Sequence, residues 1–124
     1  MSDVLLYGAG AVTILWGAAH LYPTRKVVQG FGDIGHDNAL VLTMEWIAEA
    51  ILLIFAGALV TVMTARFGAH DPAAQTTFAA CAAMLLVLAG VSLMTGGRVD
   101  FIMYRLCAPI FVLSALLILA GAFL

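Results

Sequence analysis

The residues best suited to chemistry in this chain are ionisable side chains that lie inside long apolar stretches. Glu45 and Glu49 are four residues apart in one such stretch, which places both carboxyls on one helix face, a turn apart. His20 lies near the end of the preceding stretch, and Arg105 lies near the start of the last one. Ionisable groups within a membrane usually face the bundle interior and pair with one another, and they are default candidates for function. These four residues therefore define the candidate site.

Two interpretations of this cluster are open. In the functional interpretation the cluster is a ligand-binding or proton-responsive pocket. Two neighbouring carboxyls in a low dielectric are not expected to ionise together when only one permanently charged cation lies nearby. Trp16, Trp46 and Tyr104 belong to the same predicted ligand-binding or proton-responsive set. In the structural interpretation, Arg105 neutralises one glutamate, His20 hydrogen-bonds the other, and the cluster only fixes how the helices pack.

A metal site and thiol chemistry are weaker alternatives. His20, Glu45 and Glu49 could supply three ligands, but the Glu-x-x-His pairs of di-iron bundles and the His-Glu-x-x-His zinc motif are absent. Cys81 and Cys107 should lie more than ~15 Å apart, near opposite membrane faces, which excludes a disulfide between them. No Cys-x-x-Cys or Met-x-x-Met pattern occurs. We therefore predict no metal and no cofactor, and we interpret the cysteines and methionines as packing residues.

Four apolar spans must position these groups. With 65% hydrophobic and 10% charged residues, this chain of 124 residues lies outside the soluble range, in which roughly half of the residues are apolar and about a quarter are charged. The predicted spans are residues 4–22, 39–65, 72–95 and 101–124, each long enough to cross a bilayer as a helix. The sequence thus predicts an all-α fold, an integral membrane four-helix bundle, as a single domain over residues 1–124.

Prolines and their neighbours mark the ends of the spans. Pro23 ends the first span because it lacks an amide hydrogen. Asp71 and Pro72 begin the third, since Asp accepts from free first-turn amides and Pro suits the first helical position. Pro109 either lies in the first turn of the last span or kinks it. The first span lacks a basic segment and a cleavage site, so we expect it to be a retained span and not a signal peptide.

The longest connection, residues 23–38, contains a dinucleotide-binding motif outside the structural context in which that motif works. Residues 30–35 match the G-x-G-x-x-G dinucleotide fingerprint. That motif acts only between a strand and a helix of a βαβ unit, and no strand precedes it here. We interpret residues 30–35 as a flexible interfacial loop. The whole connection is expected to rest on the membrane interface and to cover the cytoplasmic mouth of the bundle.

Basic residues are distributed unequally between the two sides of the membrane. The connections after the first and third spans hold Arg25, Lys26 and Arg98, with Arg105 just inside the last span, whereas the other side has only Arg66. By the positive-inside rule, both termini should lie outside and the candidate site should lie in the cytoplasmic half. The formal charge is −2 and no basic cluster could track a phosphate backbone, so nucleic acid is not an expected partner.

The order of these features is similar to a known layout. The first helix closes on residues 17–23 (Gly-Ala-Ala-His-Leu-Tyr-Pro), the next loop ends in Asp37-Asn38, and three more helices follow. This layout resembles the DoxX-like group of small bacterial membrane proteins. Residues 15–49 also resemble a bacterial family without an assigned role. Members of the DoxX-like group are associated with quinone-linked or thiol-linked redox assemblies, so the resemblance implies a bacterial inner membrane and a lipophilic ligand such as a quinone, or a membrane partner. It assigns no catalytic residue.

Three classes of function are compatible with the sequence. The leading hypothesis is a non-enzymatic membrane protein with a polar pocket. The pocket binds a lipophilic small molecule, or the protein docks on a membrane complex or on a second copy of itself. The alternative is proton-coupled export of small molecules. The four-helix multidrug exporters carry their essential carboxylate in the first helix, however, and the first span here has none. An enzyme that uses Glu45 or Glu49 as acid or base comes third, because no nucleophile or cofactor motif is visible.

Overall fold

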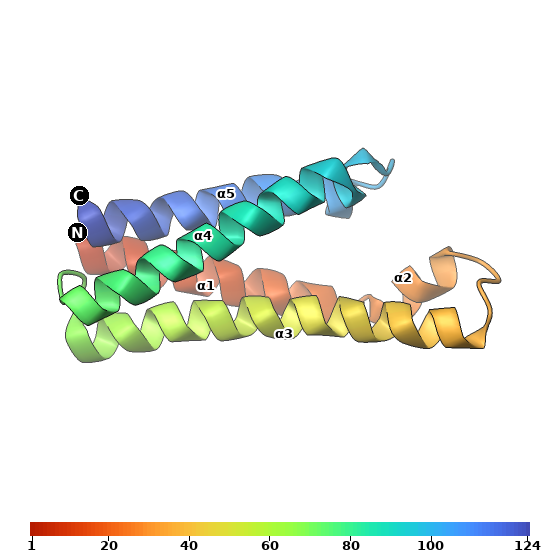
Figure 1. Cartoon of the computed structure of the whole chain (residues 1–124), viewed down its shortest axis with the longest axis horizontal. Coiled ribbons are helices and arrows are strands. Elements are labelled where there is room, and N and C mark those ends of the chain that lie inside the picture. The colour runs from red at the N-terminus through yellow and green to blue at the C-terminus, as the bar shows by residue number, and fades with distance from the viewer.

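Apolar residues fill nearly every turn of four long segments, and a segment that crosses lipid satisfies its backbone hydrogen bonds internally as a helix. The computed structural model describes residues 1–124 and contains four long helices and no strand. They are α1 (Ser2–Leu21), α3 (His36–Phe67), α4 (Pro72–Met94) and α5 (Ile102–Phe123) (Figure 1). Each is long and apolar enough to cross a membrane. The predicted all-α four-helix membrane bundle is confirmed, and each helix end lies within three residues of the predicted span.

The connection between α1 and α3 is more regular than the sequence suggested. The short helix α2 (Thr24–Gly30) occupies its first half, and the loop predicted over residues 30–35 follows from Phe31 onward. Gly32 and Gly35 then adopt φ angles of 74° and 77°, a left-handed conformation that favours glycine, and they let the chain turn into α3. The G-x-G-x-x-G match therefore covers a helix end and a turn, which is not the scaffold that a dinucleotide site needs.

The remaining helix ends follow local chemistry. Asp71 Oδ1 accepts hydrogen bonds from the amides of Ala73 (2.9 Å) and Ala74 (3.0 Å), as expected of a capping residue before Pro72. After α4, the single 3-10 turn η1 (Gly96–Arg98) leads to α5. Pro109 lies inside α5 and not in its first turn. Because proline has no amide hydrogen, one carbonyl in the preceding turn of α5 lacks its helical hydrogen bond.

Helices α1 and α3 touch through their backbones. A Cβ atom placed on Gly57 would lie 2.6 Å from the Gly10 carbonyl oxygen, and one placed on Gly17 would lie 2.9 Å from the Ala50 carbonyl oxygen. Small residues permit such close approach between membrane helices. His20 follows Gly17 by one turn on the same face and is only 5% exposed. The glycine contacts thus fix the rotation of α1 that turns His20 inward, as the sequence predicted.

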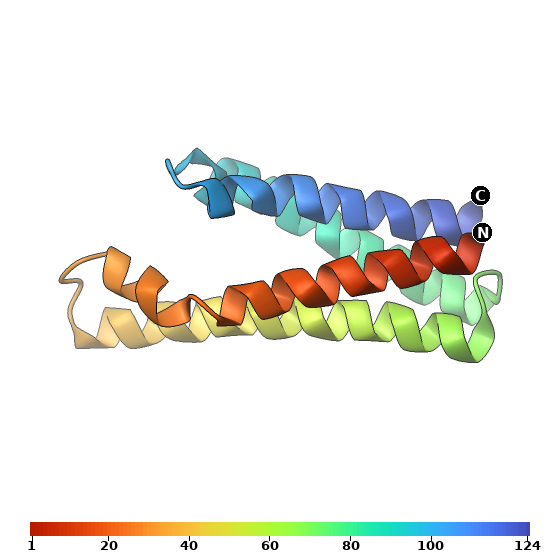
Figure 2. The same cartoon turned by 180° about the vertical axis from the view of Figure 1, so that it is seen from behind.

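The bundle is tied together at one end and open at the other. At the end that carries both termini, Asp3 Oδ1 accepts from the Ala69 amide (3.1 Å) and Gln75 Nε2 donates to the Ala122 carbonyl (2.7 Å). From there the α4–α5 pair diverges from the α1–α3 pair towards the end that carries α2 (Figures 1 and 2). This divergence creates the space in which the candidate site lies.

Helix α3 is longer than the bilayer core. Its 32 residues extend over about 48 Å, compared with a hydrocarbon thickness of about 30 Å. Figure 1 shows its first turns reaching past the end of α1, with α2 folded back beside them. The 23–38 connection therefore lies beyond the end of α1, beside the first turns of α3.

Candidate functional site

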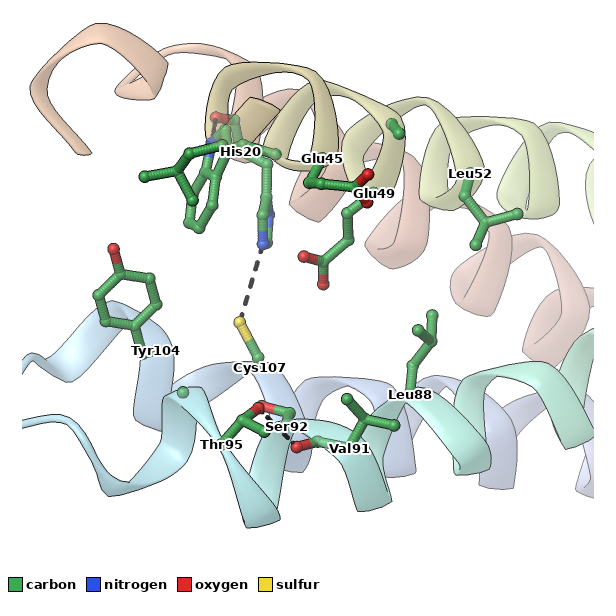
Figure 3. A pocket seen from close by; sticks show the side chains of 14 residues that line it. His20, Glu45, Glu49, Leu52, Leu88, Val91, Ser92, Thr95, Tyr104 and Cys107 are labelled. Atoms are coloured by element: carbon green, nitrogen blue, oxygen red, sulfur yellow. Dashed lines mark hydrogen bonds between the residues drawn. The ribbon is translucent and has the colours of Figure 1, made fainter. Parts of the chain in front are cut away.

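A cavity of about 500 Å³ lies at the open end, between the α1–α3 pair and the α4–α5 pair (Figure 3). The exposed side chains of Leu52 and Val91 on its α3 and α4 rims indicate that it opens sideways between these two helices. Its walls come from all four long helices and from the turn after α4: His20, Leu42, Glu45, Trp46, Ala48, Glu49, Leu52, Leu88, Val91, Ser92, Thr95, Gly96, Tyr104 and Cys107. The two predicted acids thus line the same cavity as the predicted histidine.

The cavity is acidic. Glu45 is exposed to it and Glu49 is half-buried, and Figure 3 shows the Glu49 carboxyl directed into the space between the two helix pairs. No Lys or Arg side chain lines the cavity. The single ion pair of the chain involves neither glutamate. Both carboxyls therefore lack a countercharge from within the protein.

Arg105 does not join the site. Its Nη2 atom lies 3.0 Å from Asp100 Oδ1, and its Nε donates to the Val99 carbonyl at 3.3 Å. The Arg105 side chain is 52% exposed. The ion pair with a glutamate that the structural interpretation required is therefore absent, and the expected convergence of Arg105 with the other three residues is wrong. The turn before α5 offers Asp100 as a local, solvated partner, which the first-turn arginine reaches without entering the bundle.

Contacts at both ring nitrogens fix the orientation of His20. Nδ1 lies 2.9 Å from the Trp16 carbonyl oxygen and donates to it, because a carbonyl can only accept. In the neutral ring Nε2 then carries the lone pair, and it lies 3.8 Å from Cys107 Sγ. The predicted hydrogen bond between His20 and a glutamate is absent, since both nitrogens face other groups.

Aromatic rings enclose His20. Trp16 meets the imidazole edge-on with ring centroids 5.6 Å apart, and Trp46 lies tilted against it at 5.0 Å. Trp46 Nε1 also donates to the His20 carbonyl at 2.6 Å, and Tyr104 meets Trp46 edge-on at 5.7 Å. The structure therefore brings all three predicted aromatic residues into one cluster that joins α1, α3 and α5.

Cys107 is the site residue that the sequence analysis missed. Its expected role is packing, yet its thiol faces His20 and lines the cavity. One signal in the sequence could have found it, because the predicted topology puts Cys107 near the same membrane face as His20. Cys81, by contrast, is buried in the apolar core formed with the other helices and does not line this cavity.

A second cavity of about 370 Å³ lies on the other side of His20. It is bordered by the end of α1, by α2 and by the start of α5, and no acidic residue lines it. His20, Trp46 and Cys107 line both cavities. These three residues therefore form the wall between an acidic cavity that opens towards α4 and a largely apolar cavity beside α2.

The chain offers no metal centre of the usual donor types. No group of three or more His, Cys, Asp and Glu side chains is arranged to hold a metal ion. The set weighed from the sequence, His20 with Glu45 and Glu49, lines one cavity but does not converge on a point.

No family model matches the chain, and neither a curated protein nor a solved structure matches it significantly. The geometry and chemistry of the site are therefore the basis on which a function can be proposed.

Proposed function

We propose that this protein binds a lipophilic organic cation in the cavity between α3 and α4. The observation that carries this proposal is that Glu45 and Glu49 line a cavity between apolar helices that contains no Lys or Arg, and that neither carboxyl forms an ion pair. A carboxylate that loses its hydration needs a countercharge or hydrogen bonds, and an isolated one is strongly unfavourable in a low dielectric. A cationic ligand supplies what the chain itself does not.

The other residues of the cavity suit the apolar part of such a ligand. A volume of about 500 Å³ falls in the range of small-molecule sites, which is about 300–1,000 Å³. The rings of Trp46 and Tyr104 can attract a cation through their faces. Leu52 and Leu88 supply apolar contacts on opposite walls. Since the cavity opens sideways between α3 and α4, the ligand reaches it from the bilayer.

A quinone is the second ligand class to test. The resemblance to DoxX-like proteins implies it, and the Tyr104 hydroxyl could donate to a quinone carbonyl. A neutral quinone would nevertheless leave two carboxyls without a countercharge. We therefore rank it below the cation.

Export of the bound cation is the alternative function. The observation that favours it is the shared wall, because His20, Trp46 and Cys107 line both cavities and a displacement of this wall would connect them. In this proposal the protein lies in a bacterial inner membrane with both termini outside, and the ligand passes between the bilayer and the aqueous side next to α2.

Titration of the purified protein with tetraphenylphosphonium, followed by tryptophan fluorescence, tests the proposal. Glu49→Gln should weaken binding at least about tenfold, which corresponds to about 1.4 kcal/mol. Glu45→Gln should weaken it less, because that side chain is more exposed. Asp33→Asn, on the connecting turn, is the matched control and should change nothing.

Binding of uncharged probes is the measurement that can contradict the proposed cation site. Triphenylphosphine oxide and a short-chain ubiquinone resemble the cation in size and hydrophobicity but carry no charge. If either binds as tightly as the cation, or if the Glu45→Gln/Glu49→Gln double variant binds the cation as wild type does, the proposed cation site is wrong.

A further inference from the structure

The wall between the two cavities holds two donors that soft metal ions prefer, and a third donor of this kind lines the second cavity beside it. In the neutral ring, His20 Nε2 is the unprotonated nitrogen, and it lies 3.8 Å from Cys107 Sγ. Met103, one turn before Cys107 on α5, lines the second cavity together with both of them. We propose that His20, Cys107 and Met103 bind one Cu(I) ion at this wall. The proposal goes beyond the cation site and does not depend on it.

The distance between nitrogen and sulfur suits a shared metal ion. With the bond lengths known for zinc, about 2.0–2.1 Å to imidazole nitrogen and about 2.3 Å to thiolate sulfur, a trigonal angle separates the two donors by about 3.8 Å. His20 Nε2 and Cys107 Sγ lie 3.8 Å apart. An ion can therefore enter between them without movement of either helix.

The imidazole is already prepared for coordination. Histidine ligands usually donate their other ring hydrogen to a carbonyl or carboxylate, which fixes the tautomer and the ring plane. His20 does this through Nδ1, which donates to the Trp16 carbonyl at 2.9 Å. Trp46 further restrains the His20 backbone by donating to its carbonyl oxygen. The nitrogen that faces Cys107 is thus the one able to bind a metal.

The types of donor select a soft monovalent ion. Thiolate and thioether sulfur with imidazole favour Cu(I), whereas hard ions prefer oxygen ligands. No carboxylate lines the second cavity, where Met103 lies. The thioether side chain has three rotatable bonds and can adjust to a neighbouring ion. Because the third donor is a methionine, this set is distinct from the His, Cys, Asp and Glu groups considered above.

Charge balance is compatible with a monovalent ion at these three ligands. On binding, the Cys107 thiol gives up its proton to water and the sulfur forms a bond to Cu(I), with no change of oxidation state. One thiolate and one monovalent cation give a site of zero net charge, which a low dielectric tolerates. A divalent ion would carry one further positive charge, and since Glu45 and Glu49 line the adjoining acidic cavity, the soft sulfur donors and not the charge select Cu(I).

Competition with the Cu(I) chelator bicinchoninate tests the site. Full-length protein in detergent micelles, kept anaerobic, should take up one Cu(I) per chain. Cys107→Ser should lower the affinity by at least about a hundredfold, and His20→Gln and Met103→Leu by at least about tenfold each. The matched controls are Cys81→Ser, a buried thiol elsewhere in the bundle, and Met94→Leu, an exposed methionine at the end of α4. Both should bind as wild type does.

A protection experiment covers the case in which a variant fails to fold. In the otherwise unchanged Cys81→Ser protein, Cys107 is the only thiol, and its alkylation by a membrane-permeant maleimide can be followed by mass. Cu(I) or Ag(I) should slow this alkylation at least about tenfold. Equal alkylation rates with and without the ion, or full Cu(I) uptake by folded Cys107→Ser, would overturn the proposed site. Tetraphenylphosphonium binding by the metal-free protein is measured separately, so the two proposals can fail independently.

Discussion

Replacing Gly17 with Ala tests whether direct contact between the α1 and α3 backbones sets the geometry of the site. The added Cβ would lie 2.9 Å from the Ala50 carbonyl oxygen, 2.8 Å from Ile54 Cγ1 and 3.0 Å from the Ile54 amide nitrogen. Ordinary contact begins at 3.4 Å, so the two backbones must separate locally by about 0.5 Å. Two of the three neighbours are backbone atoms, which cannot rotate away. Overpacking of this kind typically costs about 1–3 kcal/mol.

Gly8→Ala is the matched control because it lies on the same helix and a Cβ there meets nothing within 4 Å. Both substitutions gain the same helix propensity, up to about 1 kcal/mol. The difference in free energy of unfolding between the two variants therefore isolates the contact, and Gly17→Ala should be the less stable by about 1–3 kcal/mol.

The measurement is unfolding by sodium dodecyl sulfate titration, followed by far-ultraviolet circular dichroism. Tryptophan fluorescence should also shift in Gly17→Ala, since the hydrogen bond from Trp46 to the His20 carbonyl joins these two helices one turn further along. A Gly17→Ala protein as stable as Gly8→Ala, with unchanged fluorescence, would refute the argument that backbone contact positions His20.

Two further predictions concern charge. A reporter that fluoresces only in the cytoplasm, fused after Leu124, should stay dark, because the basic residues favour termini outside the cell, and bright cells would reverse the orientation. Arg105→Gln should leave tetraphenylphosphonium affinity within about twofold of wild type, because its charge is paired with Asp100 outside the cavity. A change in affinity of more than about tenfold in the Arg105→Gln titration would mean that Arg105 contributes to the site after all.

The sequence determined those features that depend on local free energies. Insertion of a span follows from the summed transfer free energies of its residues, and for this reason all four helices lie where the apolar runs predicted them. A helix start such as Asp71-Pro72 depends on hydrogen bonds between the capping side chain and backbone amides within one turn. The depth of an ionisable residue along a helix also follows from its position in the chain. The sequence alone therefore assigns His20, Glu45 and Glu49 to neighbouring levels of the bundle.

Only the tertiary structure decided which of these side chains meet. Direction around a helix axis depends on how the helices rotate and diverge, and here contacts between Gly17 and Ala50, 33 positions apart, set that rotation. The divergence of the two helix pairs opened the cavity beside the glutamates and left them without a countercharge. The same arrangement gave Arg105 a partner outside the bundle and set Cys107 opposite His20. Short-range sequence patterns do not predict these pairings, because each pairing depends on how separate segments of the chain are placed relative to one another.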